Sequence, residues 1–175
     1  MDVRLRDARP GDEAAIREVT LASYAQYAET LGPLWALYRE NIVATLASVA
    51  PAEQIVAEAK GDIVGAVLLY PGGAVMSEGP GAGPVATKWP EVRLLAVPPA
   101  ERGRGIATAL MRECARRARA VGAEALTLHT TDMMQAAVRL YERMGFARDP
   151  ALDWSPAPGL TVKGFRLPLP SGEAP

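Results

Sequence analysis

The sequence has very few of the residues that build disulfides and common metal sites. Its 175 residues include one cysteine, Cys114, and one histidine, His129. A single cysteine excludes an internal disulfide framework. One cysteine and one histidine also leave a zinc site of the usual kind short of ligands. We therefore expect no metal centre, and we interpret Cys114, on an apolar helix stripe, as a buried and unreactive thiol.

Long apolar runs and an excess of charge are also lacking. The chain has no run of about 18 apolar residues and no signal-peptide pattern, so we expect a cytoplasmic protein without membrane contact. Its formal net charge of −1 creates no overall field that would favour nucleic acid. Its 49% hydrophobic composition is enough for one core. We expect a single domain over residues 1–170 and a flexible tail over residues 171–175.

The stretch from Glu91 to Thr108 has the clearest pattern in the sequence, and the predicted fold and function depend on it. The apolar, β-branched run Val92–Val97 predicts a buried strand, which Pro98 and Pro99 end. The sequence Arg-Gly-Arg-Gly follows at 102–105. Beyond it, apolar residues recur at helical spacing, at Ile106, Leu110 and Cys114. The predicted order is strand, glycine-rich turn, helix.

This order is suited to binding an anion. The first N–H groups of a helix have no partner within it, and the helix dipole is positive at that end. Glycines at the turn remove the Cβ atoms that would keep a phosphate at a distance. Arg102 and Arg104 add formal positive charge. The stretch therefore predicts a site for a pyrophosphate.

Two common nucleotide motifs do not fit. A P-loop requires a lysine after its glycines, and none follows here. A dinucleotide fingerprint requires a third glycine where this chain has Thr108. About 70 residues remain after the turn, which leaves little room for a doubly wound fold that starts there.

The pattern RxxGxA, formed by Arg102, Gly105 and Ala107 directly after a strand, resembles the GNAT superfamily of acyl-CoA-dependent N-acetyltransferases. A second stretch, Ala136–Phe146 with the sequence AAVRLYERMGF, resembles that family's C-terminal signature. The resemblance implies a single α/β (α+β) GNAT-like domain. Its sheet would be mixed, mostly antiparallel and six- or seven-stranded, with about four flanking helices. It also implies acetyl-CoA as the acyl donor.

The expected cofactor-binding residues form two groups. Those of the turn would hold the pyrophosphate; they are Arg102, Gly103, Arg104, Gly105, Ile106, Ala107 and Thr108. The resemblance further implies that the strand offers main-chain groups to the pantetheine arm, at Leu95, Ala96 and Val97. One position departs from the family pattern, because Met134 stands where many members have an asparagine that contacts the cofactor.

The expected catalytic residues are Glu91 and Tyr141. A lysine-like amine has a pKa of ~10.4 and is protonated at neutral pH, so a positioned base is worth roughly 10²–10⁴ in rate. Glu91 resembles the base glutamate of several family members. The resemblance places Tyr141 beside the CoA sulfur, where its hydroxyl could protonate the leaving thiolate or donate a hydrogen bond to it. His129 is either an auxiliary base or a residue packed or solvated at the end of a strand.

The preferred function is acetyl transfer from acetyl-CoA to a primary amine of a small molecule or peptide, by direct attack in a ternary complex. The alternative is a non-catalytic acyl-CoA-binding module, which would need the glycine turn but not Glu91 and Tyr141. An unrelated anion-binding scaffold is a more distant alternative. The resemblance also allows a homodimer, which is common in the family.

Two helical patterns follow a first strand at residues 3–6, one stopping near Gly32 and one ending before Pro51. Their apolar faces are Ile16, Val19, Thr20, Ser23, Tyr24 and Tyr27 in the first, and Leu34, Leu37, Tyr38, Ile42, Thr45, Leu46 and Val49 in the second. The resemblance implies that this region contributes to the acceptor pocket. Its aromatic residues line that pocket or form core; they are Tyr24, Tyr27, Trp35 and Tyr38.

The remaining predictions are local. Residues 54–59 and 63–70 predict a hairpin around Gly61. The glycine-rich residues 71–84 do not suit regular structure and predict a mobile loop or a wide hairpin connection. Residues 125–130 predict a strand with Leu126 and Leu128 inward, and 161–167 predict a last strand. The helix between these strands is expected to begin with a capping box of Asp132 and Gln135 and to end at Gly145.

Overall fold

The computed structural model describes residues 3–77, 84–157 and 160–170. The chain divides into two compact units, Met1–Leu69 with Arg93–Glu113 and Tyr70–Val92 with Cys114–Pro175, here called the first and the second unit. Among the described residues, no helix has both the length and the apolar character needed to cross a bilayer.

The strands of the first unit begin with an antiparallel set, β1 (Arg4–Asp7), β2 (Glu53–Ala59) and β3 (Asp62–Tyr70). β2 and β3 form the predicted hairpin. Its two turn residues, Lys60 and Gly61, have φ values of 55° and 91°, which suit the right-handed twist of the two strands.

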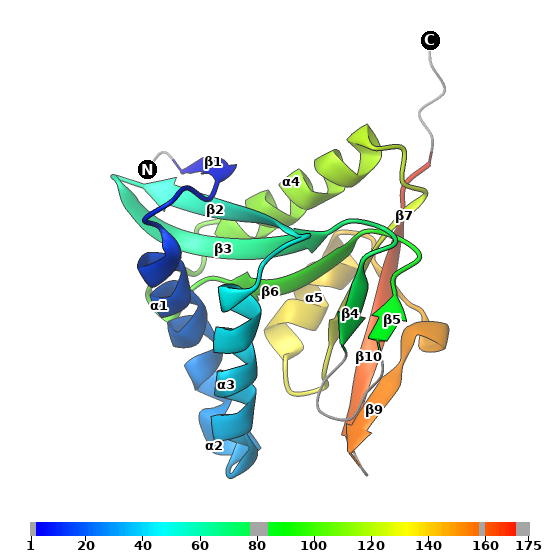
Figure 1. Cartoon of the computed structure of the whole chain (residues 1–175), viewed down its shortest axis with the longest axis horizontal. Coiled ribbons are helices and arrows are strands. Elements are labelled where there is room, and N and C mark those ends of the chain that lie inside the picture. The colour runs from blue at the N-terminus through cyan, green and yellow to red at the C-terminus, as the bar shows by residue number, and fades with distance from the viewer. Residues whose placement is uncertain (1–2, 78–83, 158–159, 171–175) are drawn as a thin grey trace. The chain divides into compact units, whose positions relative to one another are not determined.

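Two helical segments of the first unit lie side by side, α1 (Glu13–Tyr24) and α3 (Leu34–Ala47) (Figure 1). The predicted first helix is interrupted, because a 3₁₀ turn (Ala25–Tyr27) separates α1 from the short α2 (Ala28–Leu31). The α1 side chains predicted to face inward are buried at Ile16, Val19, Thr20 and Ser23. In α3 the buried residue is Ile42, whereas Leu34 and Leu37 of its predicted apolar face are about half exposed.

Helix α4 (Ile106–Ala120) begins directly after the glycine turn, as predicted. Its first residue packs closely against Gly65 of β3. A Cβ atom at Gly65 would lie 2.8 Å from Cγ2 of Ile106 and 3.2 Å from the carbonyl oxygen of Ala96. The missing side chain therefore sets how near the start of α4 comes to β3.

The second unit contains the start of β6 (Glu91–Ala96), together with β7 (Ala125–Thr130) and β10 (Leu160–Pro168). β6 and β7 are parallel, with Glu91 opposite Thr127, and β10 is antiparallel to β7. Leu126 and Leu128 are buried as predicted. Helix α5 (Gln135–Arg143) follows β7, and Gly145, with φ of 91°, lies just beyond its end as expected.

Strand β6 contributes to both units. The strand order is β1-β2-β3-β6 in the first unit and β6-β7-β10-β8 in the second, where β8 (Ala147–Arg148) and β9 (Trp154–Ala157) both pair with β10. The β6–β7 pair is parallel, and the pairs β1–β2, β2–β3, β7–β10, β10–β8 and β10–β9 are antiparallel. The α/β class with a mixed, mostly antiparallel sheet and about four main helices is confirmed. Within the described residues the sheet has eight strands, where six or seven were expected. β8 is too short to be recognised from the sequence, and β9 lies in a proline-rich segment with little strand signal.

Of the two alternatives predicted for residues 71–84, the described residues agree with the wide hairpin, and the expectation of no regular structure is wrong for them. Val75–Ser77 forms β4 and pairs antiparallel with β5 (Pro84–Ala86). Backbone pairing across the connection overrides the weak strand propensity of this composition. The part of the prediction that falls on residues 78–83, and the predicted tail at 171–175, lie outside the described residues.

The predicted capping box is also wrong. Met134 occupies the N-cap position of α5, and no side chain caps it. The Asp132 carboxylate instead pairs with Nζ of Lys163 at 2.5 Å, and the Gln135 side-chain amide donates to the main-chain oxygen of Asp132. The neighbouring strand supplies a cation that the local sequence could not indicate.

Candidate active site

The glycine turn of the first unit lies between β6 and α4, in the predicted order. Gly103 and Gly105 have φ values of 75° and 76°, a region that residues with a Cβ atom rarely adopt. A Cβ at either position would meet nothing within 4 Å, so open space lies beside this backbone. The first helical bond runs from the N–H of Ala109 to the oxygen of Gly105. The preceding amides at the start of α4 are thus suited to an anion, and the turn fits a pyrophosphate.

The two arginines of the turn have partners within the first unit. Arg102 donates to the carbonyl oxygen of Val97 at 3.3 Å, to Oε1 of Gln26 at 3.0 Å and to the carbonyl oxygen of Ser23 at 3.5 Å. Arg104 forms an ion pair with Glu101. Arg102 therefore connects the turn to the C-terminal end of α1. A role in cofactor binding stays a prediction for both residues.

The backbone of β6 is irregular just before the predicted pantetheine-binding residues. Leu94 has φ of 50°, which is uncommon for a residue other than glycine and is a form of strain that concentrates at functional sites. The N–H of Val97 donates to the Ser23 hydroxyl at 3.2 Å, and its carbonyl accepts from Arg102. Val97 thus uses both main-chain groups within the protein. Its cofactor contact, and those of Leu95 and Ala96, remain predictions.

Four aromatic side chains of the first unit form one cluster at α1 and α3. The ring centroids of Tyr24 lie 6.2 Å from Tyr27 and 6.0 Å from Tyr38, and Trp35 lies 6.3 Å from Tyr38. Burial raises the pKa of Tyr38 to about 12 and also raises the pKa of Tyr27. These phenols therefore stay neutral at physiological pH.

Glu91 and His129 meet in the second unit. Glu91 is 4% exposed, and its Oε1 lies 3.4 Å from Nδ1 of His129. The parallel register explains this contact. Glu91 is paired with Thr127, and His129, two residues further along β7, projects from the same face of the strand as Thr127. The structure brings the predicted base together with a residue that the sequence marked only weakly.

Tyr141 is also in the second unit, buried on α5. Its exposed fraction is 6%, its ring centroid lies 5.9 Å from that of Phe146, and its carbonyl accepts from the N–H of Phe146. Met134, at the position of the family's asparagine, begins the same helix by accepting from the N–H of Val138. The contacts of Tyr141 hold α5 to the segment that follows it.

Three residues that hold these groups in place were not predicted as site residues. Ser23 supports Val97, Gly65 admits the first residue of α4, and the carbonyl of Leu152 lies 2.8 Å from Nε2 of His129. Glycine inside an apolar strand often marks a close backbone approach, so Gly65 carried a usable signal. Long-range contacts of a serine hydroxyl and a main-chain carbonyl leave no local pattern.

Comparison with known proteins agrees with this strand, turn and helix. Residues 14–146 match the Acetyltransferase (GNAT) family. The chain therefore belongs to the GNAT acetyltransferase family and is an acyltransferase. None of the curated proteins has a sequence that matches it.

The fold is shared with solved GNAT structures. The chain is similar to a GNAT acetyltransferase from Brucella melitensis in complex with acetyl-CoA, with 24% identity, a TM-score of 0.58 and coverage of 96% of this chain and 88% of that one. It resembles yncA from Salmonella typhimurium, solved with its cofactor acetyl-CoA, at 20% identity, a TM-score of 0.63 and coverage of 100% and 98%. A GNAT acetyltransferase from Streptococcus pneumoniae is 17% identical, with a TM-score of 0.62 and coverage of 96% of this chain and 100% of that one. The prediction of acetyl-CoA as donor agrees with the first two.

Proposed function

We propose that this protein transfers an acetyl group from acetyl-CoA to a primary amine by direct attack. The observation that carries the proposal is the buried carboxylate of Glu91 at the start of β6, in a chain of the GNAT family. The other end of that strand leads into the glycine turn. One strand thus connects a candidate base to a candidate anion site.

The residues of the turn would hold the donor by its pyrophosphate. The amides of Ile106, Ala107 and Thr108 begin α4, where helix N–H groups lack internal acceptors, and the left-handed glycines before them leave open space. When bound, acetyl-CoA supplies an acetyl thioester that an amine can attack. The main chain of Leu95 and Ala96, next to the kink at Leu94, would align the pantetheine arm.

Glu91 would remove the proton that keeps the acceptor amine unreactive. An ammonium group of pKa ~10.4 is almost fully protonated at pH 7, and a carboxylate placed to accept that proton raises the rate by roughly 10²–10⁴. Tyr141 would donate a hydrogen bond or a proton to the departing thiolate. Moving a proton from a phenol of pKa ~10 to a thiol of pKa ~8.5 is uphill by about 2 kcal/mol, so a hydrogen bond is the smaller demand on the site.

Calorimetric titration with acetyl-CoA, CoA and NADH tests the first half of the proposal. Selective micromolar binding of the two CoA species supports it, whereas a folded protein that binds none of them contradicts it. A panel of amines with detection of released thiol then tests transfer. Binding without turnover on any amine would favour the non-catalytic acyl-CoA-binding module.

Substitution of the base completes the test. Glu91→Gln should lower kcat by roughly 10²–10⁴ and leave the affinity for acetyl-CoA unchanged. Glu142→Gln is the matched control, because Glu142 is exposed on α5, and its rate should equal that of the wild type. Equal rates in the Glu91 variant and the control would remove Glu91 from the mechanism.

A further inference from the structure

The only histidine of the chain lies between a carbonyl and a carboxylate. Nε2 of His129 is 2.8 Å from the oxygen of Leu152, and Nδ1 is 3.4 Å from Oε1 of Glu91. A carbonyl can only accept a hydrogen bond, so Nε2 must carry a proton. In the neutral ring, Nδ1 is then unprotonated, and Oε1 of Glu91 lies 3.4 Å from it.

Glu91 and His129 are in contact, but not through a short hydrogen bond. Charge-assisted hydrogen bonds between nitrogen and a carboxylate are about 2.7–2.9 Å long, and the observed separation is 3.4 Å. A proton that enters this pair would be held between Nδ1 and Oε1. Because both side chains are largely buried, at 13% and 5% exposure, water would compete weakly for it.

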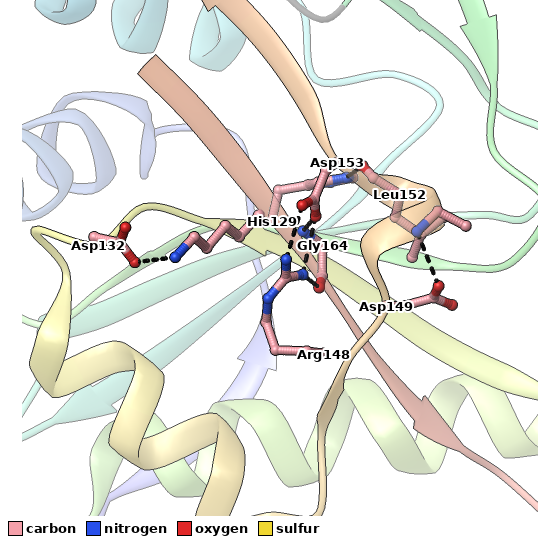
Figure 2. A network of polar contacts seen from close by, with 9 residues as sticks. His129, Asp132, Arg148, Asp149, Leu152, Asp153 and Gly164 are labelled. Atoms are coloured by element: carbon pink, nitrogen blue, oxygen red, sulfur yellow. Dashed lines mark hydrogen bonds and ion pairs between the residues drawn. The ribbon is translucent and has the colours of Figure 1, made fainter. Parts of the chain in front are cut away.

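The turn that contains Leu152 packs against β10. The 3₁₀ turn Pro150–Leu152 lies against Gly164, where an added Cβ would overlap the Cβ of Leu152. Arg148 donates to both carboxylate oxygens of Asp153, at 2.9 and 2.8 Å, and to the carbonyl of Gly164. The N–H of Gly164 donates to Asp153 at 2.8 Å. Figure 2 shows this network beside His129.

Charged side chains from three neighbouring segments lie around the imidazole. Glu91 approaches from β6, and Asp153, between the 3₁₀ turn and β9, interacts with His129 electrostatically. The hydrogen bond from Arg148 holds the pKa of Asp153 below its ordinary value, so this carboxylate stays charged. Arg148, on β8, is a nearby cation, and its charge is balanced by Asp153.

We propose that His129 is a positioning residue that takes up, at Nδ1, the proton that Glu91 removes from the acceptor amine. The inference rests on the proposed function. The amine loses one proton and keeps the electron pair for attack, and Glu91 becomes a carboxyl group. That proton passes to Nδ1, which restores the Glu91 carboxylate and leaves an imidazolium whose Nε2–H still donates to Leu152. Solvent removes the proton after the product departs.

The direct test is ¹⁵N NMR of the single imidazole in the full chain, prepared without a histidine tag. The proposal expects the Nε2–H form of the neutral ring. It also expects the histidine titration midpoint to fall in Glu91→Gln, because that variant removes the opposing negative charge. The Nδ1–H form, or an unchanged midpoint, would overturn it. Gly164→Ala should also shift the histidine signals, since it displaces Leu152 without touching Glu91.

Kinetics provide the second readout. His129→Gln should lower kcat at least about tenfold, leave the affinity for acetyl-CoA unchanged and move the acidic limb of the kcat–pH profile. Lys163→Gln, on β10 and paired with the exposed Asp132, is the control and should match the wild type in all three. A lower rate with an unmoved pH profile would reduce His129 to a structural residue. If the titration midpoint of His129 falls in Glu91→Gln but no amine is acetylated, the proposed function fails and the Glu91–His129 contact stands.

Discussion

The hydroxyl of Ser23, on α1, accepts a 3.2 Å hydrogen bond from the main-chain N–H of Val97, at the end of β6. Ser23 is 6% exposed, so water cannot readily replace it. This bond connects the first helix to the strand that precedes the glycine turn.

Removing that hydroxyl should destabilise the protein. Ser23→Ala leaves the buried N–H of Val97 without its acceptor, and we expect the free energy of unfolding to fall by about 1–3 kcal/mol. Urea denaturation measures the change. Ser48→Ala, at the exposed end of α3, should change it by less than about 0.5 kcal/mol. Equal stability of the two variants would mean that the Ser23 bond contributes nothing.

A side chain at Gly65 should weaken binding of acetyl-CoA. The added Cβ of Gly65→Ala would lie 2.8 Å from Cγ2 of Ile106, so the first turn of α4 must move. A displacement that costs about 1.4 kcal/mol of binding free energy lowers affinity tenfold, which calorimetry can detect. Adding Ile106→Ala removes the overlapping methyl group and should recover affinity, although not stability. Unchanged affinity in Gly65→Ala would show that the turn tolerates the shift.

The ion pair between Arg148 and Asp153 should make a pH-dependent contribution to stability. Arg148 lowers the pKa of Asp153 in the folded protein. The stabilisation is therefore complete above the ordinary aspartate pKa of ~3.9 and is lost as pH falls through the lower folded value. In denaturation experiments, the wild type should have a higher free energy of unfolding than Asp153→Asn at pH 7, and this difference should disappear only below about pH 4. Asp132→Asn, whose side chain is 76% exposed, should show no such difference.

Tyr141 should affect the rate and not the binding of the donor. Tyr141→Phe retains the ring that packs against Phe146 and removes the hydroxyl, so we expect kcat to fall by about a hundredfold with little change in affinity for acetyl-CoA. Steady-state rates and calorimetry on the same sample separate the two effects. An unchanged kcat would leave Tyr141 as a core residue.

Several elements could be predicted because their signals are local. The turn at Gly61 and the helix end at Gly145 depend on a backbone conformation that only a few residues adopt readily. The alternation of β7 and the inner face of α1 follow from the period of each element. The helical pattern from Leu34 is confirmed by α3, but the pattern does not indicate which of its apolar residues are buried, and Leu34 and Leu37 are about half exposed.

The sequence by itself determined the strand, turn and helix order, the conformations of Gly61 and Gly145 and the family resemblance, since each depends on residues adjacent in the chain. Only the tertiary structure decided which side chains meet. The pairing of β6 with β7 brings Glu91 to His129, and the docking of Leu152 over Gly164 gives that histidine its second partner. These contacts join residues 12 to 38 positions apart. Hydrogen-bond registry and close packing create them, and neither leaves a periodic trace in the sequence.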